Sequence, residues 1–152
     1  MKVEIPQSLR IEHQGLHDFL ARAGKEPGEL GEAAQLLGRV LQPHFQKEES
    51  FALPALGLLR ELARGRIEPE MAEALTHTDW LKKHLPDMLA EHHMILAALE
   101  RLIKAARAAD RGEYVAFAES LVNHARLEEE VLYPAAIVLG EYLKVKLKRA
   151  IA

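Results

Sequence analysis

The sequence predicts an all-α protein, folded as an up-down-up-down antiparallel four-helix bundle. Apolar residues recur with helical spacing in four long stretches, at residues 8–23, 29–53, 73–109 and 113–148. Turn-forming residues separate these stretches, at 24–28, 64–69 and 110–112. Short connections between long helices favour antiparallel neighbours. Aromatic residues, which strands favour, make up only 5% of the chain.

Proline interrupts the last three predicted helices, at Pro54, Pro86 and Pro134. Inside a helix, proline removes one backbone hydrogen bond and its ring clashes with the preceding turn. We therefore expect the second, third and fourth helices to be kinked or broken at these residues. The first helix runs to Gly24 without such an interruption.

Length and composition indicate a single globular domain over residues 1–152. A chain of 152 residues can build one sizeable core but is short for two ordinary domains. Its net charge of -3, with both signs interspersed, gives no general attraction to nucleic acid or to an anionic membrane. No run approaches the ~18 apolar residues of a membrane span, and residues 1–10 lack the apolar core of a signal peptide. We expect a cytoplasmic protein.

Two parts of the chain repeat each other. The pair Glu12-His13 recurs as Glu91-His92. A longer set recurs with an offset only one residue larger, as Leu41, His44, Glu48, Glu49, Pro54, Ala55 and Leu59 in the first copy and Leu121, His124, Glu128, Glu129, Pro134, Ala135 and Leu139 in the second. Nearly equal offsets over two different helices predict two similar αα-hairpins packed face to face. Each hairpin would supply the same side chains to a site with approximate two-fold symmetry.

Polar residues occupy positions where the apolar stripe of each helix predicts core. His13 and His92 lie on the stripes of the first and third helices. In the second helix the buried stripe is expected to run through Leu37, Leu41, His44, Glu48, Phe51 and Ala55. In the fourth helix it is expected to run through Phe117, Leu121, His124, Glu128, Val131 and Ala135. Residues four apart share a helix face, so each His-x-x-x-Glu pair aims an imidazole and a carboxylate at one point.

These buried polar side chains need partners, and a pair of metal ions would supply them. Burying carboxylates and imidazoles without partners is costly. Because the chain contains no cysteine, the ligands are nitrogen and oxygen, which suit iron, manganese, zinc, nickel or copper better than calcium. The predicted metal ligands are His13, His44, Glu48, His92, His124 and Glu128. A lone histidine on an apolar stripe is more often a hydrogen-bonded core residue, but equivalent positions in a repeat argue against that interpretation.

The other histidines and acids have weaker claims to a metal. His17 lies one turn after His13, at the edge of the same stripe, and is a candidate fifth histidine. Glu49 and Glu129 follow the two pairs, and we expect them to support the ligands from outside or to lie at the surface. The histidines expected to be peripheral are His77, His84 and His93.

The six residues resemble the pattern of the hemerythrin-like HHE cation-binding family. That pattern has one histidine on the first helix, His-x-x-x-Glu on the second, one histidine on the third and His-x-x-x-Glu on the fourth; the similarity extends over residues 8–139. The resemblance implies two iron ions (Fe2+/Fe3+) with an oxo or hydroxo bridge, although other divalent transition metals would suit the same ligands. It also implies that Glu48 and Glu128 bridge the metals and that the histidines cap them.

The pattern departs from that of the oxygen-carrying hemerythrins. Those proteins have two histidines one turn apart on the third helix and an aspartate five residues after the last histidine, whereas this chain has Leu96 in the third helix and Glu128 as its acid. Ferritin-like di-iron bundles carry Glu-x-x-His on two helices, the reverse order at a different spacing. The resemblance therefore favours the broader HHE group, associated with oxygen or nitric oxide sensing, iron handling and repair of damaged iron centres.

Three hypotheses about function follow. The first is binding or sensing of a small diatomic ligand, O2 or NO, at a di-iron centre. The second is iron storage or delivery, iron-centre repair or peroxide-type redox activity. The third is a metal-free helical interaction module. The sequence offers no acid, base or nucleophile outside the metal set, which favours a binding protein over an enzyme, and a homodimer is compatible with the predicted bundle.

Overall fold

The computed structural model describes residues 3–151, with side chains over 3–148. The predicted domain also includes residues 1–2 and 152, which lie outside the described residues. Every regular element within this part of the chain is helical. The long helices are α1 (Gln7–Ala23), α2 (Gly28–Lys47), α4 (Ala74–Ala108), α5 (Gly112–Leu127) and α6 (Tyr133–Ile151). The prediction of an all-α bundle is confirmed.

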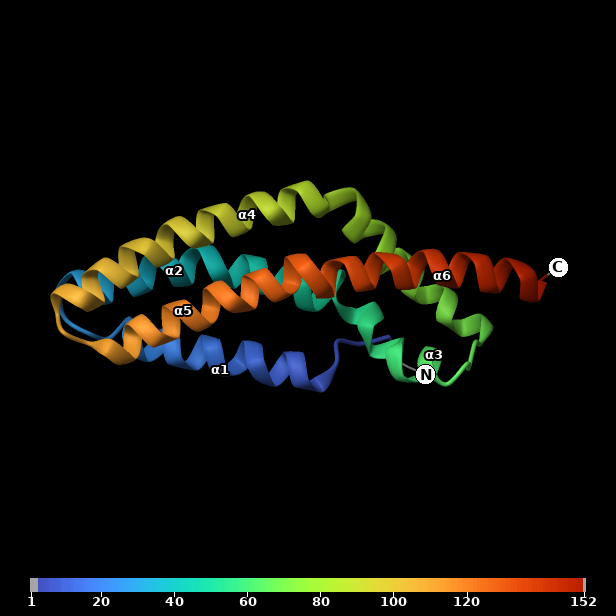
Figure 1. Cartoon of the computed structure of the whole chain (residues 1–152), viewed down its shortest axis with the longest axis horizontal. Helices are drawn as coiled ribbons and strands as arrows, with labels where there is room; N and C mark the ends of the chain where they lie inside the picture. The colour runs from blue at the N-terminus through green and yellow to red at the C-terminus, as the bar shows by residue number, and fades with distance from the viewer. Residues whose placement is uncertain (1–2, 152) are drawn as a thin grey trace.

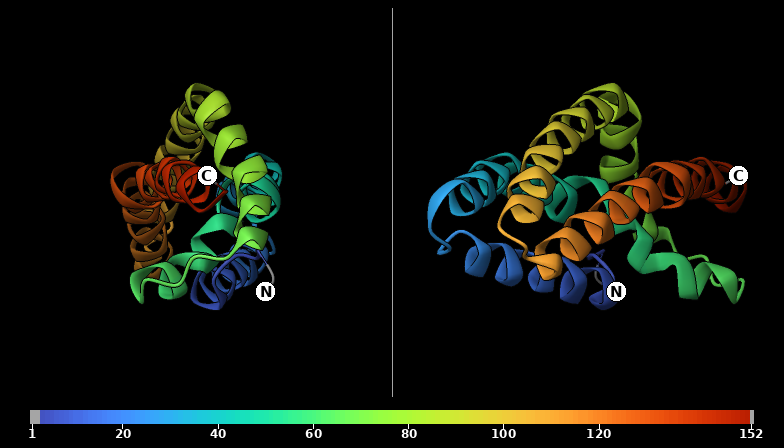
Figure 2. Two further views of the ribbon diagram at one scale, coloured as in Figure 1. Left: turned by 90° about the vertical axis from the view of Figure 1, so that its right-hand side faces the viewer. Right: turned by 60° about the vertical axis from the view of Figure 1, so that its left-hand side comes forward.

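Two antiparallel hairpins, α1–α2 and α4–α5, form the bundle (Figure 1). The turns of both hairpins lie at the same end of the molecule, on the left in Figure 1. Helix α2 packs against both α1 and α4, and α4 packs against α5; the right panel of Figure 2 shows the two hairpins beside each other. Helix α6 continues the line of α5 and extends beyond the bundle (Figure 1).

Shorter helical segments complete the chain. Two of them are π-helical turns, η1 (Glu48–Ala52) and η4 (Glu128–Leu132). Two are 3-10 turns, η2 (Pro54–Leu58) and η3 (Pro69–Glu73), and α3 (Leu59–Ala63) is a short α-helix. Segments η2 and η3 pack against α4 and α6, and therefore cover the part of α6 that leaves the bundle.

The two π turns occur at equivalent places in the repeat. The Leu53 N–H donates to the Glu48 carbonyl, five residues back, at 2.9 Å. The Tyr133 N–H donates to the Glu128 carbonyl in the same way. A π turn contains one more residue than an α turn, and such turns are frequent at functional sites. Both start at a glutamate of a His-x-x-x-Glu pair.

The extra residue of each π turn corrects the predicted stripe. Phe51 and Val131, expected to be buried, are 45% and 50% exposed. Ala52 and Tyr133 are fully buried instead. The predicted stripe assumes α-helical spacing, and the inserted residue rotates the side chains that follow it around the helix axis. Ala55, also expected on the stripe, is buried as predicted, in the 3-10 turn that begins at Pro54.

The three interrupting prolines have different effects. Pro54 follows η1 and ends the second helix. Pro134 is the second residue of α6, in the first turn of that helix, where proline is tolerated, and the fourth helix continues through η4 without a break. Pro86 lies inside α4, which remains helical and bends in its first half (Figure 1).

The apolar core forms layers along the bundle axis. The layer nearest the hairpin turns includes Leu41 and Ile95. The next layer includes Leu9, Leu53 and Met88. A third cluster packs under α6, beyond the bundle. Between the first two layers lie the buried polar residues His13, His44, Glu48, His92, His124 and Glu128.

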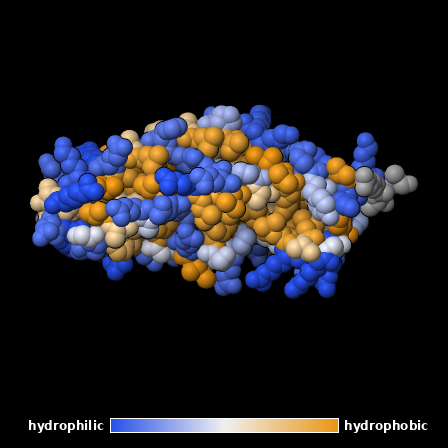
Figure 3. Space-filling model, viewed as in Figure 1, coloured by the Kyte–Doolittle hydropathy of each residue, from blue (hydrophilic) through white to orange (hydrophobic). Residues whose placement is uncertain are grey.

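The face of the molecule in Figure 3 mixes hydrophilic and hydrophobic residues. The exposed large apolar side chains include Leu127, Val131 and Val138 of the fourth helix. A search of the described residues for a helix with the length and apolar character of a membrane span found none.

Candidate metal centre

Each of the six predicted ligands is buried, with at most 4% of its surface exposed. Single histidines come from α1, α2, α4 and α5, and the glutamates are the first residues of the two π turns. The structure therefore brings residues from four helices into one layer. A carboxylate one turn after a histidine shares its helix face, which explains why the pairs arrive together.

The ligand atoms form two adjacent groups. One consists of His44, Glu48, His92 and Glu128, and the other of His13, His124 and Glu128, with donor atoms in each group within 4.8 Å of one another. The Nε2 atoms of His44 and His92 are 3.0 Å apart. Those of His13 and His124 are 3.2 Å apart. Each group thus resembles half of a two-metal site.

The two glutamates lie between these groups. Glu128 Oε1 is 3.2 Å from His92 Nε2, and its Oε2 is 3.3 Å from His124 Nε2. Glu48 Oε1 is 3.5 Å from His44 Nε2 and 3.7 Å from His13 Nε2. Glu128 therefore has one oxygen facing each group, the arrangement of a bridging ligand, whereas Glu48 approaches both groups with the same oxygen.

Four outer carboxylates orient the four imidazoles. Each histidine Nδ1 faces a glutamate of another helix, in the pairs His13–Glu49 at 3.3 Å, His44–Glu91 at 3.2 Å, His92–Glu129 at 2.8 Å and His124–Glu12 at 2.5 Å. An ionised carboxylate only accepts hydrogen bonds, so Nδ1 carries the hydrogen and Nε2 presents a lone pair. Carboxylates in this position set the tautomer and raise the basicity of metal-binding histidines.

Sequence reasoning found only part of this outer set. Glu49 and Glu129 were expected to support the ligands or to lie at the surface, and both bond to a histidine while remaining partly exposed. Glu12 and Glu91 were used only to detect the repeat. Glu12 directly precedes His13, and Glu91 directly precedes His92. This recurrence is the sequence signal that could have identified both glutamates as partners of the metal site.

Two inner oxygen atoms of the site lack hydrogen-bond partners, and a cation would satisfy them. The two Nε2 atoms of each histidine pair lie about 3 Å apart, too close for both to carry a hydrogen, so at least one lone pair in each pair faces inward. Glu48 Oε1 and Glu128 Oε2 are buried and accept no hydrogen bond. Lone pairs and orphaned carboxylate oxygens around one space are the donor set of a metal ion, so the residues fit the cation that the fold family implies.

Burial also perturbs the titration of the ligands. Burial and the negative charge of Glu128 raise the pKa of the Glu48 carboxyl well above its ordinary value. Burial and the neighbouring His92 lower the pKa of His44. Hydrogen bonds to Glu128 and Glu129 outweigh burial and raise the pKa of His92, and the hydrogen bond to Glu128 and its charge do the same for His124. A metal ion that binds here must displace any proton that these ligands hold.

Tyr133 belongs to the site and was missed by sequence reasoning. Its side chain is fully buried, and its Oη donates to Glu48 Oε2 at 2.7 Å. The same oxygen is 3.3 Å from the Nε2 atoms of both His44 and His92. Alpha-helical spacing placed Tyr133 off the buried stripe, and only the π turn rotates it inward.

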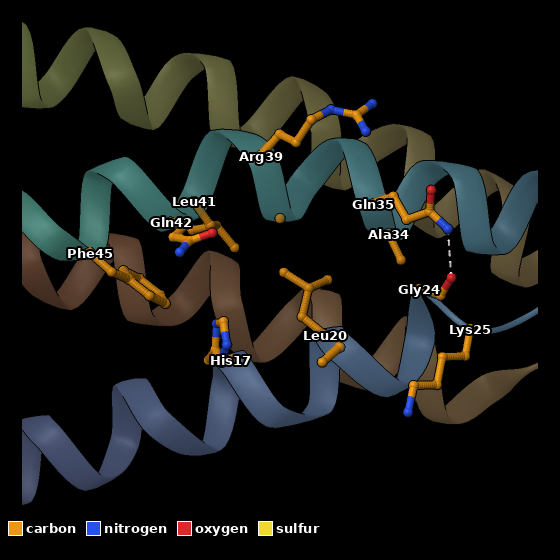
Figure 4. A pocket seen from close by; sticks show the side chains of 12 residues that line it. His17, Leu20, Gly24, Lys25, Ala34, Gln35, Arg39, Leu41, Gln42 and Phe45 are labelled. Atoms are coloured by element: carbon orange, nitrogen blue, oxygen red, sulfur yellow. Dashed lines mark hydrogen bonds between the residues drawn. The ribbon is translucent and has the colours of Figure 1, made fainter.

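The remaining histidines lie outside both groups. His17 is exposed and lines a cleft of about 420 Å³ between α1 and α2, together with Gln42 and Phe45 (Figure 4). Phe45 stacks on the His13 ring at 4.2 Å between centroids. The histidines expected to be peripheral take no part in the two groups. The His84 ring lies against Trp80 in a tilted arrangement, His93 is exposed, and the buried Nδ1 of His77 has no hydrogen-bond partner.

Comparison with known proteins agrees with this geometry. The model of the hemerythrin HHE cation binding domain matches residues 5–136, a segment that contains all six predicted ligands and Tyr133. Comparisons with curated proteins and with solved structures found no match. The chain belongs to the hemerythrin HHE cation-binding domain family.

Proposed function

We propose that this protein binds two iron ions, one in each histidine group, and that the pair binds or senses a small diatomic molecule, O2 or NO. The observation that carries the proposal is the bridging position of Glu128, whose two oxygens each face one histidine pair at 3.2 and 3.3 Å. Imidazole and carboxylate suit iron, and also manganese, zinc, nickel or copper.

Coordination arithmetic supports ligand binding. Four histidines and two bridging carboxylates provide about eight bonds, whereas two octahedral ions have about twelve positions. Several positions therefore remain for water or an incoming molecule. Because the six ligands are nearly inaccessible, the incoming molecule must be small.

Anaerobic loading with ferrous iron tests the proposal. We expect two iron atoms per chain and new charge-transfer absorption when O2 or NO is admitted, which fades when the gas is removed if binding is reversible. The His84→Ala variant, which lacks a histidine outside the site, is the matched control and should behave as wild type. An iron-loaded protein whose spectrum does not respond to either gas would contradict ligand binding.

The same sample distinguishes the second hypothesis. Release of iron, or steady consumption of added peroxide that is lost in His44→Ala, would favour iron delivery or redox turnover over reversible binding. The chain has no other described cluster of His, Asp and Glu that rivals this one in burial and number.

A further inference from the structure

We propose that Tyr133 is an additional metal ligand, whose phenolate oxygen binds the ion held by His44 and His92. The position for an incoming molecule is then on the other ion, held by His13 and His124. This inference rests on the two-metal function proposed above and makes the two ions chemically different.

The distances around Tyr133 fit one face of an octahedral metal site. The His44 Nε2, His92 Nε2 and Tyr133 Oη atoms form a triangle with sides of 3.0, 3.3 and 3.3 Å. Two ligands at right angles, with bonds of about 2.1 Å, lie about 3 Å apart. An ion bonded to both imidazoles is therefore within reach of the phenol oxygen.

The other histidine group has no equivalent of this oxygen. In the repeat, Leu53 occupies the place of Tyr133, and both side chains are fully buried in the same apolar cluster. Leucine offers no donor atom. With both carboxylates bridging, one ion has about five protein donors and the other about four, out of about six positions each.

Access to solvent also favours the ion held by His13 and His124 as the one that binds an incoming molecule. His13 lines a cleft of about 270 Å³ with His17, Gln42, Phe45 and Glu49. This cleft shares His17, Gln42 and Phe45 with the larger one between α1 and α2 shown in Figure 4. A small molecule that enters between α1 and α2 therefore meets His13 first.

Binding of the phenol needs no oxidant or further reactant. The O–H bond breaks, its electron pair forms the bond from oxygen to the metal ion, and the proton is released to water. The hydrogen bond that Tyr133 donates to Glu48 Oε2 is lost in this step, which frees that carboxylate oxygen for a metal.

The test compares iron-loaded wild type with Tyr133→Phe after oxidation in air. Wild type is expected to show visible phenolate-to-ferric charge transfer and resonance-enhanced phenolate ring vibrations. Tyr133→Phe should lose both signals, retain at least one iron per chain and still bind azide at the ion held by His13 and His124. Tyr114→Phe is the matched control, because Tyr114 is also buried but bonds to Glu26, near the hairpin turns.

A second sample avoids any change at the site. The chain has three tyrosines, so the double variant Tyr114→Phe/Tyr142→Phe leaves Tyr133 as the only source of a phenolate signal. Retention of the signal in this variant supports the inference, even where Tyr133→Phe folds poorly. Two bound irons with no phenolate signal in wild type would overturn the inference and leave the two-metal function standing. Failure of wild type to hold iron would overturn the proposed function itself.

Discussion

The two halves of the bundle supply the same ligands but differ in the residues beside them. Three pairs of equivalent residues distinguish the first half from the second: His17 and Leu96, Phe45 and Ala125, and Leu53 and Tyr133. His17 and Phe45 of the first half line an open cleft, whereas Tyr133 of the second half places a phenol beside its histidine pair. The repeat therefore supplies the two candidate metal groups, and in our proposal its exceptions determine where a further molecule would bind.

The outer carboxylates of the two halves also differ, in their exposure and in their partners. Glu91 is 21% exposed and bonds to Lys47 at 2.8 Å as well as to His44. Its equivalent, Glu12, is 44% exposed, and the residue equivalent to Lys47 is Leu127. The outer carboxylate of His44 is thus less exposed and is anchored by Lys47, whereas that of His124 is more exposed.

The largest effect is expected where the halves share a ligand. Glu128→Ala should lose both ions, because Glu128 belongs to both groups, whereas His44→Ala should lose about one. Metal content after desalting measures this difference. Glu130→Ala, which removes a neighbouring exposed carboxylate, is the control. Wild-type metal content in Glu128→Ala would show that the two groups do not share this carboxylate.

Metal removal should cost both halves stability. Saturating metal contributes about 3–4 kcal/mol at 100 to 1,000 times its Kd, and each kcal/mol shifts Tm by about 2–4 °C in a chain of this size. Removal of one ion is therefore expected to lower Tm by roughly 6–16 °C, and chelation of both ions from wild type by about twice that. The shift should be smaller in His44→Ala and in His124→Ala, each of which retains one ion. If chelator leaves the Tm unchanged, the result would favour the hypothesis of a metal-free interaction module.

Variants of the outer carboxylates should show whether the two halves differ in metal affinity. Loss of such a partner typically weakens metal affinity by about 10- to 100-fold. Glu91→Ala is expected to cost more affinity than Glu12→Ala, since Glu91 is less exposed and is anchored by Lys47. Competition with a chromophoric chelator measures the metal affinity of both variants. Equal losses would indicate that the Lys47 contact has no effect on the site.

The smallest effect is expected at the hairpin turns, where Arg111 binds both oxygens of Glu26 at 2.9 Å and so joins the two halves. Hydrogen bonds from Arg111 and Tyr114 lower the pKa of Glu26. This bond network therefore stabilises the fold above the ordinary carboxyl pKa of 4.5, and the stabilisation is lost as the pH falls through the lower folded value.

Arg111→Ala should lower Tm slightly at neutral pH without changing metal content, because exposed ion pairs contribute little. The difference in Tm between wild type and variant should shrink in acid. Thermal melts at neutral pH and at decreasing pH below 4.5 check this. A difference that grows in acid would contradict the assignment of the lowered pKa to Arg111.

Much of the fold and of the candidate site could be predicted from the sequence. Helical periodicity and short turns predicted the bundle, and the repeat predicted that His44 and Glu48 would meet His124 and Glu128. The stripe failed at the next position after Glu48 and Glu128, where Phe51 and Val131 were expected in the core and are exposed, although Ala55 is buried as expected. Sequence spacing assumes one helical period, and a π turn changes that period locally.

The sequence by itself determined the class of fold, the two-fold repeat and the six buried side chains that the structure gathers into two candidate metal groups. These follow from spacing along single helices, which is a local property of the chain. Only the tertiary structure decided that Glu12 and Glu91 orient histidines of other helices and that Tyr133 faces one histidine pair. Those contacts depend on where neighbouring helices meet and on the extra residue of each π turn, and neither is encoded in the period of one helix.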